Sequence, residues 1–436
     1  MAGQISRRTA LRWLVTGAAA LPGAATLRAQ QPGAAPAAAE PPPSRGAAPP
    51  ALAPFDRLMT TFLEQQRVPG AALAVTRGSR LVYARGFGFA EVETGRPVLP
   101  AALFRIASLS KPITAVAVLQ LAERGGFALD DRVFAILPAR EWLPAGCDQR
   151  LHAITVRQLL QHTAGWDRDA SFDPIARPHE VAQALKVPLP VGPAAVVRYA
   201  LTLPLDFAPG ARHAYSNVGY LLLGRLLEQV SGQPYEAYVK AKVLAPLGIT
   251  QMQLGRACKG DLASAEVRYY DAQRRVAPAV NGPQLGASVP LVYGGENVEA
   301  FEAHGGWIAS AIDLVRFAAA FDAPAASPLL SAASLAALFA RPAGAAGFEA
   351  NGQPRAAYYG CGWSVRPVEG TGRANTWHTG LIAGSSALLV RRHDGLNWAV
   401  LFNTDSGPTG ADLAGLIDPL VHGAADAVRA WPEGAE

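Results

Sequence analysis

Apolar and polar residues alternate in two stretches near the two ends of the chain. In the first stretch, "GAALAVTRGSRLVYARGFGFAEVET", the alternation runs on both sides of residues 77–79, which predicts a β-hairpin that turns at Arg-Gly-Ser. In the second, "SSALLVRRHDGLNWAVLFNT", it runs around Asp394-Gly395, a dipeptide that favours a tight hairpin turn. Strands at both ends of the sequence predict one sheet built from its N- and C-terminal thirds.

Between these stretches, apolar residues recur with the spacing of α-helices. Helical patterns and Pro/Gly-rich loops dominate from about residue 130 to residue 290, so we expect a helical lobe inserted between the strands. The strongest helix signals are Pro112 with Gly125-Gly126, the capping boxes Thr155/Gln158 and Ser310/Asp313, and the apolar run from Asn217 to Val230.

The composition is that of a globular protein, with 50% hydrophobic and 17% charged residues in a chain of 436. This length exceeds a single compact core, so we expect one large domain or two interleaved domains. The formal charge of +5 is spread over scattered arginines with no basic run longer than a pair, which argues against nucleic acid as a partner. There is no H-E-x-x-H and no C-x-x-C, so we expect no metal and no cofactor, and Cys147, Cys258 and Cys361 allow at most one disulfide.

The N-terminal segment "ISRRTALRWLVTGAAALPGAATLRAQ" has the layout of a cleavable export signal. Arg7 and Arg8 precede a short apolar stretch and a run of small residues, and the S-R-R-T-x-L pattern is typical of a twin-arginine signal. A membrane anchor is the alternative, but the stretch is short and rich in Gly, Ala and Pro, whereas a spanning helix needs roughly 20 apolar residues. We therefore expect a periplasmic or secreted protein without a membrane span after cleavage. The predicted boundaries are residues 1–29 for the signal, 30–54 for a Pro/Ala-rich linker, 55–425 for the folded domain and 426–436 for a tail.

One lysine stands in an almost wholly apolar segment, "FRIASLSKPITAVAVLQLAERGG". Only five of the 39 basic residues are lysines, and Lys111 alone among them has a serine, Ser108, three positions before it. Residues three apart share one face of a helix, so a partly desolvated Lys111 amine could take a proton from the Ser108 hydroxyl at the positive end of the helix. The structural alternative is a helix-capping serine beside a lysine whose ammonium group reaches solvent.

Tyr215 and Asn217 precede the long apolar helix, in the stretch "PGARHAYSNVGY". The functional interpretation makes the Tyr215 hydroxyl a second proton-transfer group and the Asn217 amide a donor to a substrate carbonyl. The structural alternative is helix capping, because Ser216 and Asn217 are both good N-cap residues.

A third motif, His378-Thr379-Gly380, leads the strand in "WHTGLIAGSSALLV". Gly380 lets another backbone or a ligand approach the strand closely. Similar letters occur in "QHTAGW", where we interpret Gly165 as a helix C-cap and His162 as a cation in the last turn of a helix. Only the later motif borders a strand along which a substrate could lie.

Taken together, "SLSK", "YSN" and "HTG", in this order, resemble the motifs of the serine hydrolases of the β-lactamase-related family. That family includes class C β-lactamases, D-alanyl-D-alanine carboxypeptidases and some esterases, and the resemblance covers about residues 55–422. It implies an α+β fold of the β-lactamase/transpeptidase type, in which helices flank an antiparallel sheet. It also implies hydrolysis of an amide or ester, in a small molecule or a peptide, through an acyl-enzyme.

The resemblance also assigns a role to each motif residue. Ser108 is the acylated nucleophile, and Lys111 and Tyr215 share its proton and later activate the deacylating water. An oxyanion hole formed by two backbone N–H groups completes the site, and its loss typically lowers turnover by about a hundred- to a thousand-fold. The remaining assignments are Asn217 for the substrate amide, His378, Thr379 and Gly380 for the substrate along the strand edge, and the backbone of Ser108 and Leu381 for the oxyanion hole.

Departures from the family patterns narrow the expected activity. The second motif is Y-S-N rather than S-D-N and no E-x-x-L-N stretch exists, so the class A β-lactamase pattern does not apply. Many class C enzymes carry Lys-Thr-Gly as the third motif, whereas His378 is a weaker and pH-dependent partner for a substrate carboxylate. Arg391 and Arg392 could reach such a carboxylate, or they could form a solvated strand end. These features disfavour efficient β-lactam hydrolysis, and the absence of G-x-S-x-G excludes an ordinary α/β-hydrolase.

The leading expectation is an exported serine hydrolase whose substrate is a β-lactam, a D-Ala-terminated peptide or a small ester. The alternative from another class is a protein that is acylated by penicillins, or that senses cell-wall peptides, without turning them over. An exported domain with a purely structural role is the third alternative.

Overall fold

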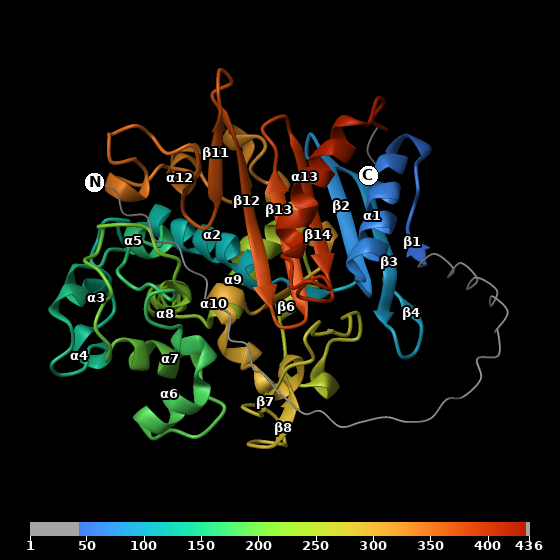
Figure 1. Ribbon diagram of the computed structural model, residues 1–436. Helices are drawn as coiled ribbons and strands as arrows, with labels where there is room; N and C mark the ends of the chain where they lie inside the picture. The colour runs from blue at the N-terminus through green and yellow to red at the C-terminus, as the bar shows by residue number, and fades with distance from the viewer. Residues whose placement is uncertain (1–42, 433–436) are drawn as a thin grey trace, which may run out of the picture. The chain divides into compact units, whose positions relative to one another are not determined.

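An antiparallel sheet of nine strands is the main structural element of the protein (Figure 1). The structure is a computed structural model that describes residues 43–432. Along the sheet the strands follow the order β1-β3-β2-β14-β13-β12-β11-β10, and the short β4 pairs with β3 beside this path. The strands are β1 (Ser44–Arg45), β2 (Gly70–Arg77), β3 (Arg80–Glu91), β4 (Arg96–Pro97), β10 (Tyr358–Tyr359), β11 (Ser364–Val368), β12 (Arg373–Ile382), β13 (Ser385–Arg391) and β14 (Leu396–Phe402).

The two predicted hairpins are present and meet in the middle of this sheet. Strands β2 and β3 turn at Gly78-Ser79, and strands β13 and β14 turn at Asp394-Gly395. Strand β2 then pairs with β14 in antiparallel register, so the N- and C-terminal segments share one sheet as the sequence predicted. The result is the expected α+β architecture.

Alternate residues of the central strands face two different hydrophobic layers, as the two-residue period of a strand requires. On β14, Trp398 and Phe402 pack in one layer with helices α1 (Ala53–Gln66) and α13 (Leu413–Asp426), which contact each other on that face. Leu401 packs in the opposite layer, which contains helices of the inserted lobe. Burying each of these large side chains contributes about 1.5–3 kcal/mol, so the sheet is fixed between helices on both faces.

The inserted lobe is built around helix α8, which packs against α2, α5, α7 and α10. Both predicted capping boxes form, at the starts of α5 and α11. No disulfide links the lobe to the sheet, because Cys147, Cys258 and Cys361 are all unpaired. The remaining helices and strands are α2 (Ser110–Glu123), α3 (Val133–Ile136), α4 (Ala139–Trp142), α5 (Val156–Leu160), α6 (Pro178–Leu185), α7 (Pro193–Ala200), α8 (Asn217–Ser231), α9 (Tyr235–Val239), α10 (Glu302–Gly305), α11 (Ala311–Ala319), α12 (Ala332–Leu338), β5 (Phe104–Arg105), β6 (Gln253–Leu254), β7 (Val276–Pro278), β8 (Ser288–Pro290) and β9 (Trp307–Ala309).

The folded part extends beyond both predicted boundaries. Ser44 pairs with Phe87 in the sheet and Leu52 is fully buried, so the predicted linker 30–54 ends too late. At the other end, the Trp431 ring lies 6.1 Å from the Phe55 ring, so the predicted tail, as far as Trp431, also belongs to the fold. The physical reason is that a few apolar side chains inside a Pro/Ala-rich stretch suffice to anchor it to the sheet. The predicted signal, 1–29, lies outside the described residues.

None of the helices within residues 43–432 combines the length and the apolar character that crossing a membrane would require.

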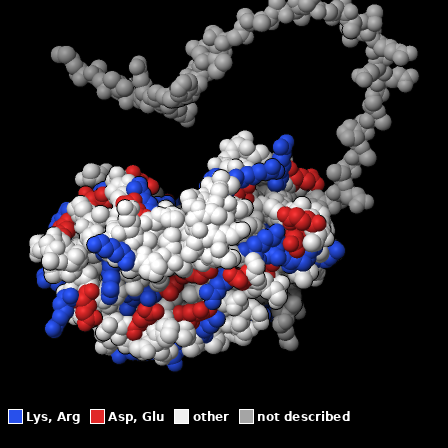
Figure 2. All heavy atoms as spheres, turned by 90° about the horizontal axis from the view of Figure 1, so that it is seen from below, with Lys and Arg blue, Asp and Glu red and all other residues white. Residues whose placement is uncertain are grey.

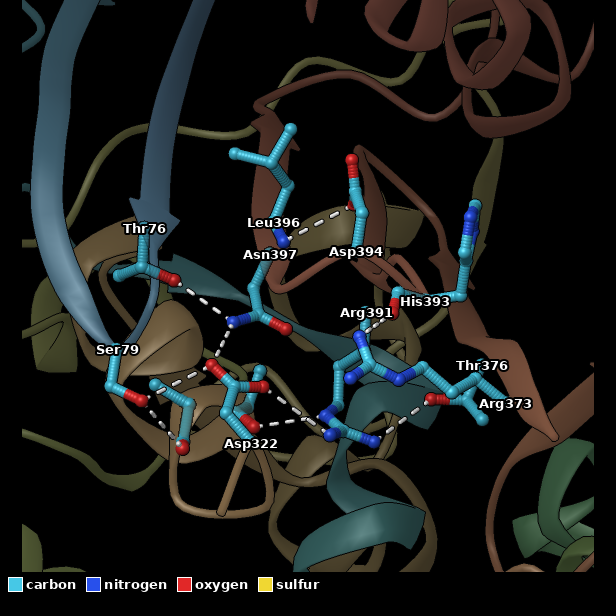
Figure 3. Close-up of polar contacts among 12 residues, drawn as sticks. Thr76, Ser79, Asp322, Arg373, Thr376, Arg391, His393, Asp394, Leu396 and Asn397 are labelled. Atoms are coloured by element: carbon cyan, nitrogen blue, oxygen red, sulfur yellow. Dashed lines mark hydrogen bonds and ion pairs between the residues drawn. The ribbon is translucent and has the colours of Figure 1, made fainter. Parts of the chain in front are cut away.

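A polar cluster centred on Asp322 ties helix α11 to the sheet (Figure 3). The Asp322 carboxylate accepts hydrogen bonds from Asn397 Nδ2 at 2.9 Å and from Ser79 Oγ at 3.3 Å. It also pairs with Arg391, whose Nη2 lies 3.3 Å from Oδ1 and whose Nε donates to the Ala318 carbonyl. Arg391 is therefore a structural residue and not a partner for a substrate carboxylate.

Replacing Asp322 by alanine is expected to lower the free energy of unfolding by about 3 kcal/mol, because the change leaves the Arg391 guanidinium buried without its counter-charge. Asp426→Ala is the matched control. It removes an exposed partner of Arg392, so its expected cost is below about 1 kcal/mol. Urea denaturation followed by circular dichroism measures both values, and equal losses for the two variants would contradict the buried pairing.

Candidate active site

Ser108 lies in a single 3-10 turn, Ala107–Leu109, that connects β5 to α2. Ala107 has a φ of 47°, in the left-handed region that residues other than glycine rarely adopt, at a cost of about 1–2 kcal/mol. The Ser110 hydroxyl holds this turn by donating to the Ala107 carbonyl at 2.7 Å. The N-cap position of α2 is Leu109, so Ser108 does not cap the helix and its hydroxyl is available for other contacts.

The Lys111 amine is completely buried and has three oxygen neighbours. Nζ lies 3.0 Å from Ser108 Oγ, 2.8 Å from Asn217 Oδ1 and 2.8 Å from the His304 carbonyl oxygen. The amide and carbonyl oxygens only accept hydrogen bonds, whereas a hydroxyl can also donate. An uncharged amine has two N–H bonds and one lone pair. With both N–H bonds directed to Asn217 and His304, the lone pair faces the Ser108 hydroxyl.

Burial also lowers the pKa of Lys111 well below its usual range. The negative charge of Asp173 opposes this shift, and the positive charge of Arg168 adds to it. A lysine that reaches solvent, the structural alternative, is excluded because the side chain has no exposed surface. Because its pKa is lowered, the Lys111 amine gives up its proton more readily, and in its uncharged form it can act as a proton acceptor.

Tyr215 brings a second hydroxyl to the serine. Its Oη donates to Ser108 Oγ at 2.8 Å. Burial raises the pKa of Tyr215, so the phenol keeps its proton at neutral pH. Ser216 caps helix α8 by accepting a hydrogen bond from the Gly219 N–H. Capping and site chemistry are thus divided between neighbours: Ser216 fixes the helix start, and Tyr215 and Asn217 on either side face the Ser108–Lys111 pair.

Asn217 is oriented by an acidic residue that the sequence did not single out. Its Nδ2 donates to Asp173 Oδ2 at 2.6 Å, which turns Oδ1 towards Lys111. Asp173 is itself held by the Ile175 N–H at the start of a short 3-10 turn. One N–H bond of the Asn217 amide remains available for a substrate carbonyl.

Strand β12 passes close to the turn that carries the serine. A Cβ atom at Gly380 would lie 2.1 Å from the Ile106 carbonyl oxygen, so only glycine permits this approach. The next residue, Leu381, is 57% exposed and lines the same cavity as Ser108. Both residues of the predicted oxyanion hole therefore border one cavity.

His378 is buried on the inner side of β12, whereas Thr379 is exposed. His378 Nδ1 lies 2.7 Å from the Thr379 carbonyl oxygen and Nε2 lies 2.9 Å from the Tyr359 hydroxyl. Burial lowers the pKa of His378 to about 3. His378 is therefore not the pH-dependent cation that the sequence predicted, because its imidazole is neutral at physiological pH.

The similar motif that we assigned to a helix end lies beside Tyr215 instead. The His162 ring is 4.3 Å from the Tyr215 ring, and its Nδ1 accepts the Ser216 N–H at 3.2 Å. Burial lowers the pKa of His162 well below its usual range. Helix α5 ends at Leu160, so the interpretation of His162 as a last-turn cation and of Gly165 as a C-cap is wrong. Local helix signals could not show that this loop folds back under the tyrosine.

A cavity of about 450 Å³ opens at Ser108. Its lining also includes Asn217, His304 and Leu381. A larger cavity, of about 830 Å³, is bordered by none of the predicted site residues. The smaller cavity is bordered by Ser108, whose hydroxyl contacts the Lys111 amine, so it is the candidate active site.

Comparison with known proteins agrees with this geometry. Residues 55–421 match the sequence model of the family described as Beta-lactamase. Esterase EstB of Burkholderia gladioli is 34% identical over 258 residues, which cover 56% of this chain and 59% of that protein. Penicillin-binding protein 4* of Bacillus subtilis (strain 168) is 31% identical over 198 residues, which cover 45% of this chain and 40% of that protein. The chain thus spans about half the length of the curated relatives it matches.

The fold is shared with a solved structure, that of the octameric penicillin-binding protein homologue from Pyrococcus abyssi. The TM-score is 0.62 at 23% sequence identity, and the match covers 84% of this chain and 77% of that chain. This likeness confirms the predicted fold of the β-lactamase/transpeptidase type.

Proposed function

The chain belongs to the beta-lactamase family of serine hydrolases, and on that premise we propose that it cleaves ester or amide bonds through an acyl-enzyme on Ser108. The observation that supports this most strongly is the 3.0 Å contact between Ser108 Oγ and the amine of Lys111, which is buried and whose pKa burial lowers well below its usual range. A serine without such an acceptor is a weak nucleophile at neutral pH.

In the proposed acylation step, Ser108 Oγ attacks the substrate carbonyl carbon while its proton passes to Lys111 Nζ. The carbonyl oxygen becomes an oxyanion that the backbone N–H groups of Ser108 and Leu381 stabilise. The tetrahedral intermediate then collapses, and the leaving group takes a proton through Tyr215, which is hydrogen-bonded to the same Oγ at 2.8 Å. Lys111 returns its proton to Tyr215, so the site regains its starting protonation state.

Deacylation reverses these roles with water as the nucleophile. Tyr215 and Lys111 together accept a proton from the water that attacks the acyl carbonyl, and Ser108 Oγ is released as the hydroxyl. Both residues are present and contact Ser108, which favours turnover over a permanently acylated state.

The substrate is proposed to be a small molecule or a short peptide. The names of the relatives include an esterase and a penicillin-binding protein, so both ester and amide bonds are candidates. On the face drawn in Figure 2, acidic and basic side chains are interspersed and form no continuous basic stripe. That distribution does not suit a nucleic-acid partner.

A substrate panel combined with intact-mass measurement tests the proposed function. Nitrocefin, p-nitrophenyl butyrate and a D-Ala-D-Ala peptide are incubated with the mature protein, and the mass of the protein is followed during turnover. We expect hydrolysis of at least one compound and a transient acyl adduct that maps to Ser108. A stable penicillin adduct without turnover would support the non-hydrolytic alternative, and no adduct with any compound would contradict the proposal.

We also propose that the protein is exported through a twin-arginine-type signal, on the strength of Arg7, Arg8 and the apolar stretch that follows. Replacing both arginines by lysine is expected to keep the protein in the cytoplasm with residues 1–29 still attached. Fractionation of an expressing bacterium, followed by N-terminal sequencing, measures this. Processing that is equal in the parent and the double variant would argue against this route.

A further inference from the structure

His162 is a buried histidine that the proposed mechanism does not use. It lies in the loop after helix α5 and has almost no exposed surface. Its φ of 56° falls in the left-handed region that residues other than glycine rarely adopt. Its Nε2 is buried and has no hydrogen-bond partner in the protein. Both features destabilise a folded chain, and such features are concentrated at functional sites.

The loop that begins at His162 is fixed to the segment that leads into helix α8. The Thr163 carbonyl accepts the Gly210 N–H at 2.7 Å. The Gly165 carbonyl accepts the Phe207 N–H at 3.2 Å. A Cβ atom at Gly165 would lie 2.8 Å from the Phe207 carbonyl oxygen, so glycine permits this close approach. The loop therefore runs alongside the segment that carries the tyrosine of the site.

His162 holds the chain on both sides of Tyr215. Its carbonyl oxygen accepts the Ala214 N–H at 2.9 Å, and its Nδ1 accepts the Ser216 N–H at 3.2 Å. The rings of His162 and Tyr215 are also in contact, with their centroids 4.3 Å apart. One residue thus bonds to the neighbours before and after the tyrosine and packs against the ring between them.

The contact between the two rings carries no proton. Nδ1 accepts the Ser216 N–H, which places the single proton of the neutral imidazole on Nε2. Nε2 has no partner, and the Tyr215 hydroxyl donates to Ser108 Oγ instead. Burial lowers the pKa of His162 well below its usual range, which keeps Nδ1 available as an acceptor. His162 therefore acts on the site through the position of Tyr215.

We infer that His162 is a positioning residue for the proposed reaction, because it fixes the Tyr215 hydroxyl where it can protonate the leaving group. The inference rests on the proposed function, in which Tyr215 delivers that proton. A displacement of about 1 Å can lower a rate by about a hundredfold, so small shifts of this segment are costly. Of the two hydrogen bonds made by His162, the one from Ser216 is made by the side chain and can be removed by substitution.

Butyrate esters with different leaving groups test the inference. p-Nitrophenolate leaves as a stable anion without a proton, whereas ethoxide has to be protonated as it leaves. The readout is kcat/KM for ethyl butyrate divided by kcat/KM for p-nitrophenyl butyrate, with phenyl butyrate in place of the ethyl ester if the latter is hydrolysed too slowly to measure. In Tyr215→Phe, which lacks the proton donor, we expect this ratio to fall by about a hundredfold. A partly unfolded or generally disturbed site would lower both rates and leave the ratio unchanged.

Two substitutions separate the hydrogen bond from the ring at position 162. His162→Phe keeps a ring and removes the acceptor, so we expect the ratio to fall by about tenfold or more. His162→Asn keeps an acceptor and is tolerated at positive φ, so its ratio should stay within about threefold of the parent value. His422→Phe is the matched control, because this histidine packs against Trp398 in the other hydrophobic layer, and its ratio should equal that of the parent.

Near-UV circular dichroism checks that each variant is folded. If His162→Phe is not folded, His162→Gly takes its place, because glycine adopts this φ without strain and also lacks the acceptor. The same fall in the ratio is expected. An unchanged ratio in the folded variant without the acceptor would overturn the inference, and so would an asparagine variant whose ratio falls as far.

Crystal structures of the variants separate failure of this inference from failure of the proposed function. In the variant without the acceptor, we expect Tyr215 Oη to lie beyond hydrogen-bond distance of Ser108 Oγ, whereas His162→Asn should retain the 2.8 Å contact. If the parent hydrolyses none of the esters, the proposed function fails and the structures alone decide the inference, which an unchanged contact would overturn. If Ser108 hydrolyses the esters while the ratio and the contact stay unchanged, only the inference fails.

Discussion

Alanine in place of Ser108 is expected to lower kcat/KM for every hydrolysed substrate by on the order of 10⁴-fold or more. The Ser108 hydroxyl lies between the Lys111 amine, at 3.0 Å, and the Tyr215 hydroxyl, at 2.8 Å. In the proposed mechanism it is the atom that forms the covalent bond, and its neighbours only move protons. The contributions of Lys111 and Tyr215 to catalysis are therefore largely lost when the hydroxyl is removed. Initial rates with p-nitrophenyl butyrate or any compound hydrolysed by the parent measure the effect.

The fold of Ser108→Ala serves as the control for this result. The turn around residue 108 is held by the Ser110 side chain and the Ala107 carbonyl, neither of which the substitution touches. The thermal unfolding midpoint should therefore stay close to that of the parent. A well-folded Ser108→Ala protein with activity within tenfold of the parent would remove Ser108 from the mechanism.

Lys111→Arg and Lys111→Met are both expected to lower kcat/KM by about 10²–10⁴-fold, the range that general-base catalysis typically contributes. The pair separates two roles that one lysine could have. Arginine keeps a positive charge but cannot lose a proton in a protein, whereas the methionine side chain has no charge and no ionisable proton. If Lys111 acts as a base, both variants fail; if it acts as a fixed cation, arginine retains much of the activity.

The stability of Lys111→Met provides a second readout. The pKa of Lys111 is lowered in the folded state, so between that value and its unfolded value of about 10.4 the unfolded chain binds more protons. The wild-type lysine therefore costs stability at pH 7, and this cost shrinks as the pH rises towards 10.4. We expect Lys111→Met to be at least as stable as the parent at pH 7, with an advantage that decreases at higher pH. Urea denaturation at several pH values checks this, and a loss of stability at pH 7 would contradict it.

The sheet and its flanking helices could be predicted because their signals are local. The dipeptide Asp394-Gly395 marks one hairpin, and the capping boxes at Thr155 and Ser310 mark two helix starts. Each signal depends on a few neighbouring residues, so it survives without knowledge of the tertiary structure. The domain limits could not be predicted this way, because Leu52 and Trp431 join the core through contacts with residues far away in the sequence.

The residues of the candidate site also fall into two groups, those with a local signal in the sequence and those without one. The three-residue spacing of Ser108 and Lys111 is local, and their 3.0 Å contact follows from it. Asp173 bonds to Asn217 from a loop 44 residues away, and its neighbourhood carries no pattern that distinguishes it from other loop acids.

The charge states of the histidines could not be predicted from the sequence either. Each of His162 and His378 is followed by a threonine in the sequence, yet both are buried and neutral in the structure. Burial of an ionisable side chain depends on the whole fold, whereas helix ends and turns do not. Sequence patterns therefore brought out the pair Ser108 and Lys111, which lie in contact, but they did not show the electrostatics of the cavity.

The protonation state of Lys111 at pH 7 is the most direct test of the account. The chain has only five lysines, so the ¹⁵N or ¹³Cε resonances of selectively labelled lysine can be assigned by comparison with Lys111→Met. Titration between pH 5 and 11 is expected to show that Lys111 is already uncharged at pH 7. A Lys111 resonance that remains that of an ammonium until about pH 10 would contradict the proton-accepting role on which the mechanism depends.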